Sequence, residues 1–98
     1  LSVLLAAGLR GIEQGYDLPP EVPGNVLEMS SAERRDAGIE RLPETLSEAL
    51  DVLEGSELVR EALGDHVFGW FLRNKREEWD RYQHHVSRFE LETYLPIL

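Results

Sequence analysis

Three histidines are the side chains in this sequence best suited to bind a metal ion or to transfer a proton. His84 and His85 are adjacent, so on a helix they would point about 100° apart and could not chelate one ion from one face. His66 has no Asp, Glu or His three or four residues away on either side. The pattern therefore predicts surface or packing histidines rather than metal ligands.

Paired carboxylates that could act as acid and base are offered by Glu77, Glu78 and Asp80. Basic side chains surround them at helical spacing, namely Arg73, Lys75, Arg76 and Arg81. This spacing is typical of a solvent-facing lattice of ion pairs. The sequence also contains no phosphate-binding glycine loop followed by lysine, and no serine with a histidine or acid partner at a recognisable spacing. We therefore expect no catalytic, cofactor-binding or metal-binding residue in this chain.

The composition limits the classes of partner. The 98 residues, 42% hydrophobic and 30% charged, suffice for one domain with a modest core. A formal net charge of −9 argues against nucleic acid or an anionic membrane as a partner. The longest apolar run is far shorter than a membrane span of roughly 20 residues, and the absence of cysteine suits the cytoplasm. We expect a cytoplasmic protein that binds neither nucleic acid nor membrane.

The elements that must position these residues are helices. Three Ser/Thr-x-x-Glu patterns, starting at Ser30, Thr45 and Ser87, each precede an apolar pattern and predict capped helix starts. We expect a mainly α fold of about five helices with a loop-rich N-terminal half. The predicted divisions are a buried helix over 1–15, a loop region with a short helix over 16–43, a helical region over 44–87 and a C-terminal tail over 88–98.

The longest helix is expected to begin after a capping Asp65 and to carry one apolar stripe. The residues of this stripe are Val67, Phe71, Trp79, Tyr82 and Val86. The first helix is apolar nearly all round, as buried helices are, and no capping residue or initiator Met precedes it. These features predict that the chain is cut from a longer protein.

Several stretches resemble the C-terminal end of bacterial type I glutamine synthetases, particularly actinobacterial forms. LLAAGLRGIEQGYDLPPE resembles the family's buried helix and following loop, the stretch 24–79 resembles its closing helical region, and VSRFELETYLPIL is similar to its tail. The resemblance implies part of an α+β catalytic domain. The parent enzyme would ligate ammonia to glutamate through γ-glutamyl phosphate, using ATP and Mg²⁺ or Mn²⁺. The family's catalytic and metal-binding motifs would lie upstream of Leu1, so none can be assigned to residues of this chain.

The resemblance carries two further expectations. In regulated members a tyrosine in an Asn-Leu-Tyr-Asp/Glu-Leu motif is adenylylated, whereas the matching stretch here, 25–29, has Leu27 at the tyrosine position. Family members also form homo-oligomers, dodecamers of two stacked hexamers, in which the tail packs into the opposite ring. The residues that would fill the pocket of a partner subunit are Phe89, Leu91, Tyr94, Leu95 and Leu98.

Three functions therefore remain open. The first is a structural, oligomer-forming segment of glutamine synthetase that catalyses nothing and binds no cofactor by itself. The second is the same segment of a γ-glutamyl ligase that uses another amine. The third is a free-standing helical module that binds a protein partner.

Overall fold

The computed structural model describes residues 1–98 and contains six α-helices, two 3₁₀ turns and no strand. The mainly α fold predicted from the sequence is confirmed. The elements are α1 (Ser2–Gln14), η1 (Val26–Glu28), α2 (Ser31–Asp36), α3 (Leu46–Glu54), α4 (Glu57–Leu63), α5 (Asp65–Gln83), α6 (Arg88–Tyr94) and η2 (Leu95–Ile97).

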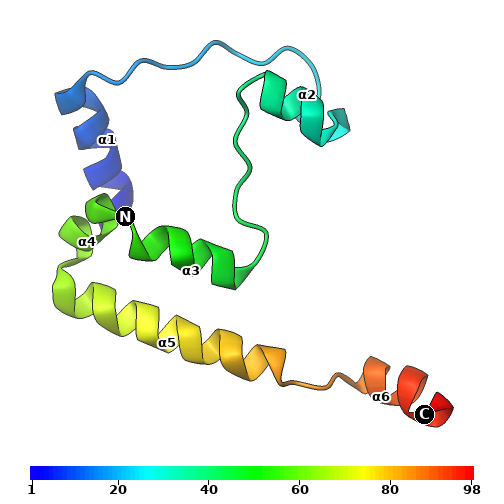
Figure 1. Cartoon of the computed structure of the whole chain (residues 1–98). Helices are drawn as coiled ribbons and strands as arrows, with labels where there is room; N and C mark the ends of the chain where they lie inside the picture. Colours follow the sequence, from blue (N-terminus) through cyan, green and yellow to red (C-terminus); the bar gives the residue numbers. More distant parts are fainter.

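The helices form an open arrangement rather than a closed bundle (Figure 1). The packed pairs of helices are α1 with α4, α3 with α5, and α4 with α5. The segment carrying α2 stands apart at the end of two long connections, and α6 lies beyond the far end of α5 (Figure 1). The body is therefore α1, α3, α4 and α5, from which two short helical segments project.

Serine caps begin α2 and α6 as expected. Ser30 Oγ accepts a hydrogen bond from the Glu33 backbone N–H at 3.3 Å, and the Glu33 carboxylate accepts one from the Ser30 N–H at 2.7 Å. Ser87 and Glu90 make the same reciprocal pair. Each box satisfies backbone N–H groups that the first turn of a helix leaves without partners.

The start of α3 differs from the predicted box. Thr45 Oγ1 accepts from the Glu48 N–H at 3.2 Å, but the Glu48 carboxylate accepts from the N–H of Glu44 and not from that of Thr45. Half of the capping box therefore forms, and the second bond is displaced by one residue toward the N-terminus.

The prediction that Asp65 caps α5 is wrong. Gly64 holds the capping position with φ 80° and ψ 154°, a backbone conformation that is essentially restricted to glycine. Asp65 is the first helical residue, and its carboxylate lies 3.4 Å from an Arg60 guanidinium nitrogen. The sharp corner between α4 and α5 thus depends on glycine rather than on an aspartate cap.

The core consists of two fully buried side chains, Leu50 on α3 and Phe68 on α5. The Arg60 guanidinium covers the Phe68 ring at 4.5 Å from its centre, a cation–π geometry. Most of the predicted apolar stripe of α5 does not face this core, because Phe71 is 38% exposed and Val67 is 48% exposed. Of the predicted residues only Trp79 is half-buried, and the inward face runs through it together with Phe68 and Leu72.

Most of the apolar surface of α1 is open to solvent. Its Arg10 pairs with Glu61 on α4, while Leu4, Leu5 and Ile12 are 73%, 65% and 80% exposed. Helix α1 forms at the expected place, but within this chain none of its residues is buried. The expectation that a larger protein buries this helix stays a prediction.

The radius of gyration and the accessible surface area also show that the molecule is open rather than compact. The radius of gyration is 19.2 Å, whereas a compact domain of about 100 residues has one near 13 Å. The accessible surface is 8653 Å², against roughly 5,700 Å² for a compact monomer of this mass. The chain therefore exposes far more surface than a self-contained domain of its size.

Candidate functional site

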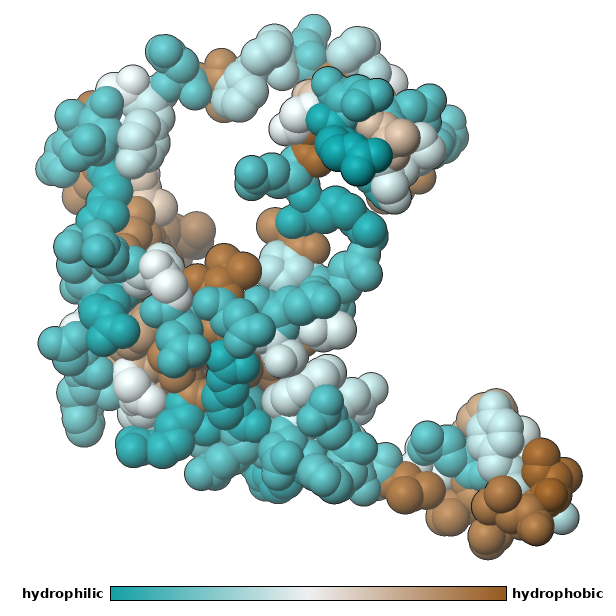
Figure 2. All heavy atoms as spheres, in the orientation of Figure 1, coloured by the Kyte–Doolittle hydropathy of each residue, from teal (hydrophilic) through white to brown (hydrophobic).

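The C-terminal tail, residues 88–98, is the most prominent apolar feature of the surface. Figure 2 shows hydrophobic side chains gathered at the projecting end of the molecule, over α6 and η2. All five tail residues predicted to contact a partner are exposed: Phe89 67%, Leu91 47%, Tyr94 52%, Leu95 62% and Leu98 100%. They lie on α6, η2 and the residue after η2, and none of them is buried.

Local interactions hold the tail in a helical shape. Besides the Ser87–Glu90 box, Arg88 Nε donates to the Glu92 carboxylate at 2.6 Å. The Phe89 and Tyr94 rings meet edge to face, with centres 6.4 Å apart. Pro96 then follows in η2 as the α-helix tightens into a 3₁₀ turn. The apolar side chains are therefore carried by a short α-helix and the 3₁₀ turn that follows it, rather than by an extended strand.

Hydrogen bonds from Ser87 act on the ionisation of Glu90. The side chain of Ser87 first, and its backbone N–H second, lower the pKa of the Glu90 carboxyl below its ordinary value of 4.5. Nearby His85 adds a smaller effect in the same direction. Glu33 has its pKa lowered in the same way by Ser30 in α2. Both carboxylates are thus ionised partners of the helix N-terminus at neutral pH.

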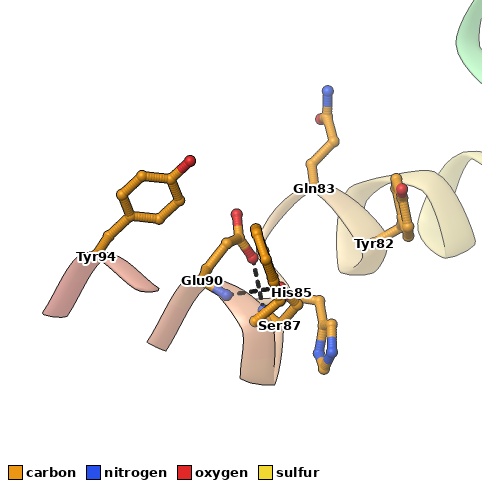
Figure 3. A pocket seen from close by; sticks show the side chains of 7 residues that line it. Tyr82, Gln83, His85, Ser87, Glu90 and Tyr94 are labelled. Atoms are coloured by element: carbon orange, nitrogen blue, oxygen red, sulfur yellow. Dashed lines mark hydrogen bonds between the residues drawn. The ribbon is translucent and has the colours of Figure 1, made fainter. Parts of the chain in front are cut away.

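An open hollow of about 540 Å³ lies where the tail leaves α5. Figure 3 shows its wall, with Tyr82 and Gln83 from the end of α5 and Glu90 hydrogen-bonded to Ser87 at the start of α6. The hollow is open to solvent and is lined by both polar and aromatic side chains. It marks the bend between the two helices, and His85, Phe89 and Tyr94 complete its lining.

The turn at residues 25–29 presents Leu27 to solvent. Asn25 Oδ1 accepts from the Leu27 N–H at 3.1 Å, and its amide nitrogen donates to Glu28 at 3.1 Å, so the side chain of Asn25 closes the 3₁₀ turn. Leu27 is 89% exposed. The position that the resemblance assigned to a modified tyrosine is therefore accessible, but it is occupied by a side chain without a hydroxyl group.

The charged side chains near the end of α5 form exposed contacts with groups three or four residues away. Lys75 contacts Glu78 at 2.6 Å within the helix, and His84 Nδ1 lies 2.7 Å from the backbone oxygen of Asp80. No three His, Cys, Asp or Glu side chains lie close enough together to hold a metal ion.

Sequence reasoning missed the contacts that Arg76 makes with a neighbouring helix. Arg76, expected to pair along α5, instead donates from Nη2 to Asp51 at 2.6 Å and to Glu54 at 3.1 Å, both on α3. Its partners are 25 and 22 residues away in the sequence, so helical spacing could not reveal them. We call these three residues the Arg76 clasp.

Comparison with known proteins assigns this sequence to a family. The sequence matches the family described as "Glutamine synthetase, catalytic domain" over residues 1–94. The chain belongs to the glutamine synthetase family. The helices, the turn that presents Leu27 and the start of the tail all fall within the matched residues.

Individual glutamine synthetases align along nearly the whole chain. The chain is 54% identical to the glutamine synthetase of Mycolicibacterium smegmatis and 55% identical to that of Mycobacterium tuberculosis. Both alignments extend over 96 residues, or 98% of the chain. Identity to the Thermus thermophilus protein is 45% over 95 residues, or 97% of the chain. The chain spans about a fifth of these relatives: 22%, 22% and 21% of their lengths, respectively.

Within the chain, no helix combines the length and apolar character needed to cross a bilayer.

Proposed function

We propose that this chain is the non-catalytic C-terminal helical part of a glutamine synthetase catalytic domain, and that its tail joins subunits of the assembled enzyme. The observation that carries the proposal is the family match over residues 1–94. The whole protein would form γ-glutamyl phosphate from glutamate and ATP and let ammonia displace the phosphate. ATP and Mg²⁺ or Mn²⁺ would be bound outside this segment, in a cytoplasmic enzyme.

The distribution of apolar surface supports a structural role. Leu50 and Phe68 alone are buried, while α1 and the tail expose leucine and aromatic side chains that would be covered by other parts of the enzyme. Such patches are typical of surfaces that contact protein. Helix α1 would pack within its own subunit, and the tail would pack into the opposite ring of a dodecamer.

A structural segment of the ligase is preferred over the two other functions. The relatives named above are each described as glutamine synthetase, which favours ammonia as the amine over other amines. A free-standing interaction module would not require similarity in unbroken order over nearly all of the chain. Leu27, exposed and without a hydroxyl group, further indicates that the enzyme would not be controlled by adenylylation at this position.

A chimaera tests the proposal directly. The matching 96 residues of the Mycolicibacterium smegmatis relative would be replaced by the corresponding residues of this chain. We expect the chimaera to form glutamine from glutamate, ammonia and ATP with release of phosphate, whereas the isolated 98-residue chain should release none. Activity and mass would be measured on the same purified samples.

Two further samples separate the chemistry from the assembly. Substituting Leu95→Glu in the tail should lower the mass of the chimaera's assembly, and Val52→Glu, on an equally exposed residue of α3, serves as its matched control. A chimaera that folds and assembles but ligates no amine would contradict the proposal. So would phosphate release by the isolated chain with glutamate and ammonia.

A further inference from the structure

Helix α5 connects the core to the tail, and its buried and half-buried residues lie between Phe68 and Trp79. Phe68 anchors its beginning in the core. The half-buried Trp79 and the exposed Tyr82 line a groove with Thr45 and Leu46 at the start of α3. Residues 80–86 are all exposed. Beyond this groove α5 continues to Gln83, and the non-helical residues 84–87 then connect it to α6.

The Arg76 clasp is the polar part of the contact between α5 and α3. One guanidinium nitrogen reaches two carboxylates that stand three residues apart on α3, Asp51 and Glu54. Hydrogen bonding to Asp51, the largest effect, and to Glu54 raises the pKa of Arg76 above its ordinary value. The other basic residue at this level, Lys75, pairs only along its own helix. Arg76 thus links α5 to α3 where Lys75 does not.

Small rotations at the clasp become displacements at the tail. From Arg76 to Gln83 the helix continues for roughly 10 Å at 1.5 Å per residue, and α6 lies beyond it (Figure 1). Between Trp79 and Ser87 every residue is exposed, so no buried side chain in this stretch restrains the direction of the tail. Placement of Phe89 and Leu95 against a partner accordingly depends on the angle between α3 and α5, together with the conformation of residues 84–87.

We propose that Arg76 is a positioning residue for assembly: by clasping Asp51 and Glu54 it aims α5, and with it the apolar tail, at the neighbouring subunit. This inference rests on the proposed role of the tail. It assigns Arg76 no part in the reaction itself. Because exposed ion pairs contribute little to folding stability, the effect of the clasp should appear in the association of subunits rather than in the unfolding of each one.

The test uses the chimaeric enzyme with three substitutions. Arg76→Met keeps an aliphatic stem but removes the charge, Arg76→Lys keeps the charge but not the planar fork, and Lys75→Met is the matched control. Sedimentation over a range of protein concentrations would give the concentration at which the assembly half-dissociates. Thermal unfolding and activity per subunit would be measured on the same samples.

We expect Arg76→Met to raise the half-dissociation concentration by about threefold or more, with partial rescue by Arg76→Lys and no change for Lys75→Met. High salt should weaken assembly of the parent chimaera more than that of Arg76→Met, because it screens the clasp. Equal dissociation curves for Arg76→Met and Lys75→Met would overturn the inference. So would weaker assembly that only accompanies a loss of thermal stability. A parent chimaera that assembles without ligating an amine would instead contradict the proposed function and leave the clasp measurable.

Discussion

Phe68 and Phe71 lie within one turn of α5 but in opposite environments. Phe68 is 1% exposed beneath the Arg60 guanidinium, whereas Phe71 is 38% exposed. A buried aromatic side chain contributes through the apolar area removed from water and through the contacts that fill its cavity. With only one other buried side chain, Leu50, the chain depends heavily on Phe68.

We therefore expect Phe68→Ala to cost about 3–5 kcal/mol of stability, the usual range for a buried phenylalanine. That is a large part of the stability of a small domain, so the helical signal in circular dichroism should fall sharply at 25 °C. Phe71→Ala is the matched control and should lose far less helix. Equal losses for the two variants would show that the core has been located on the wrong face of α5.

Helix α6 shows how a short element is maintained away from the core. It has seven residues, which is too few to be stable in water by propensity alone. Its capping box and its Arg88–Glu92 pair provide local stabilisation. Helix α2, with six residues and the same kind of box, is in the same position.

The capping box makes the order of α6 depend on pH. The pKa of Glu90 is lower in the folded tail than its ordinary value of 4.5. The ionised carboxylate therefore contributes fully to stability above that value, and the contribution is lost as the pH falls below it through the lowered pKa. We expect amide NMR signals of residues 88–94 to lose helical character on acidification below about pH 4.5. Ser87→Ala should reduce the helicity at neutral pH and flatten this dependence; an unchanged acid transition in that variant would contradict the assignment.

At the scale of the whole molecule, the open shape leaves two apolar surfaces uncovered. One is on α1 and the other is the tail, and they lie on separate parts of the molecule (Figure 1, Figure 2). Arg10 is the only charged residue of Ser2–Ile12 and is paired with Glu61, so the exposed face of α1 carries little charge despite the net charge of −9. Copies of the chain can therefore approach on these surfaces with less repulsion than elsewhere.

We expect the isolated chain to self-associate, with a mass above that of a monomer in size-exclusion chromatography with light scattering. The double substitution Leu5→Glu and Ile12→Glu on α1 should shift the distribution toward the monomer, as should Leu95→Glu in the tail. Val52→Glu, at a residue of α3 that is 66% exposed, should have no such effect. A stable monomer at high concentration for the unsubstituted chain would refute this expectation.

The sequence by itself determined the local features. Ser30 and Ser87 identify the starts of α2 and α6, because a capping hydroxyl and a carboxylate three residues later need only each other and the adjacent backbone. Gly15, in the left-handed conformation, ends α1 for an equally local reason. These predictions concern groups within four residues of one another.

Only the tertiary structure decided which face of α5 is buried and how Arg76 is used. A helical pattern that contains Val67, Phe68, Trp70 and Phe71 has apolar residues in several directions, and the neighbouring helices select one of them. Arg76 could pair with carboxylates on its own helix, but the packing of α3 against α5 brings Asp51 and Glu54 within reach. Both outcomes depend on contacts between residues that are far apart in the sequence. The spacing of residues along one helix gives no information about such contacts.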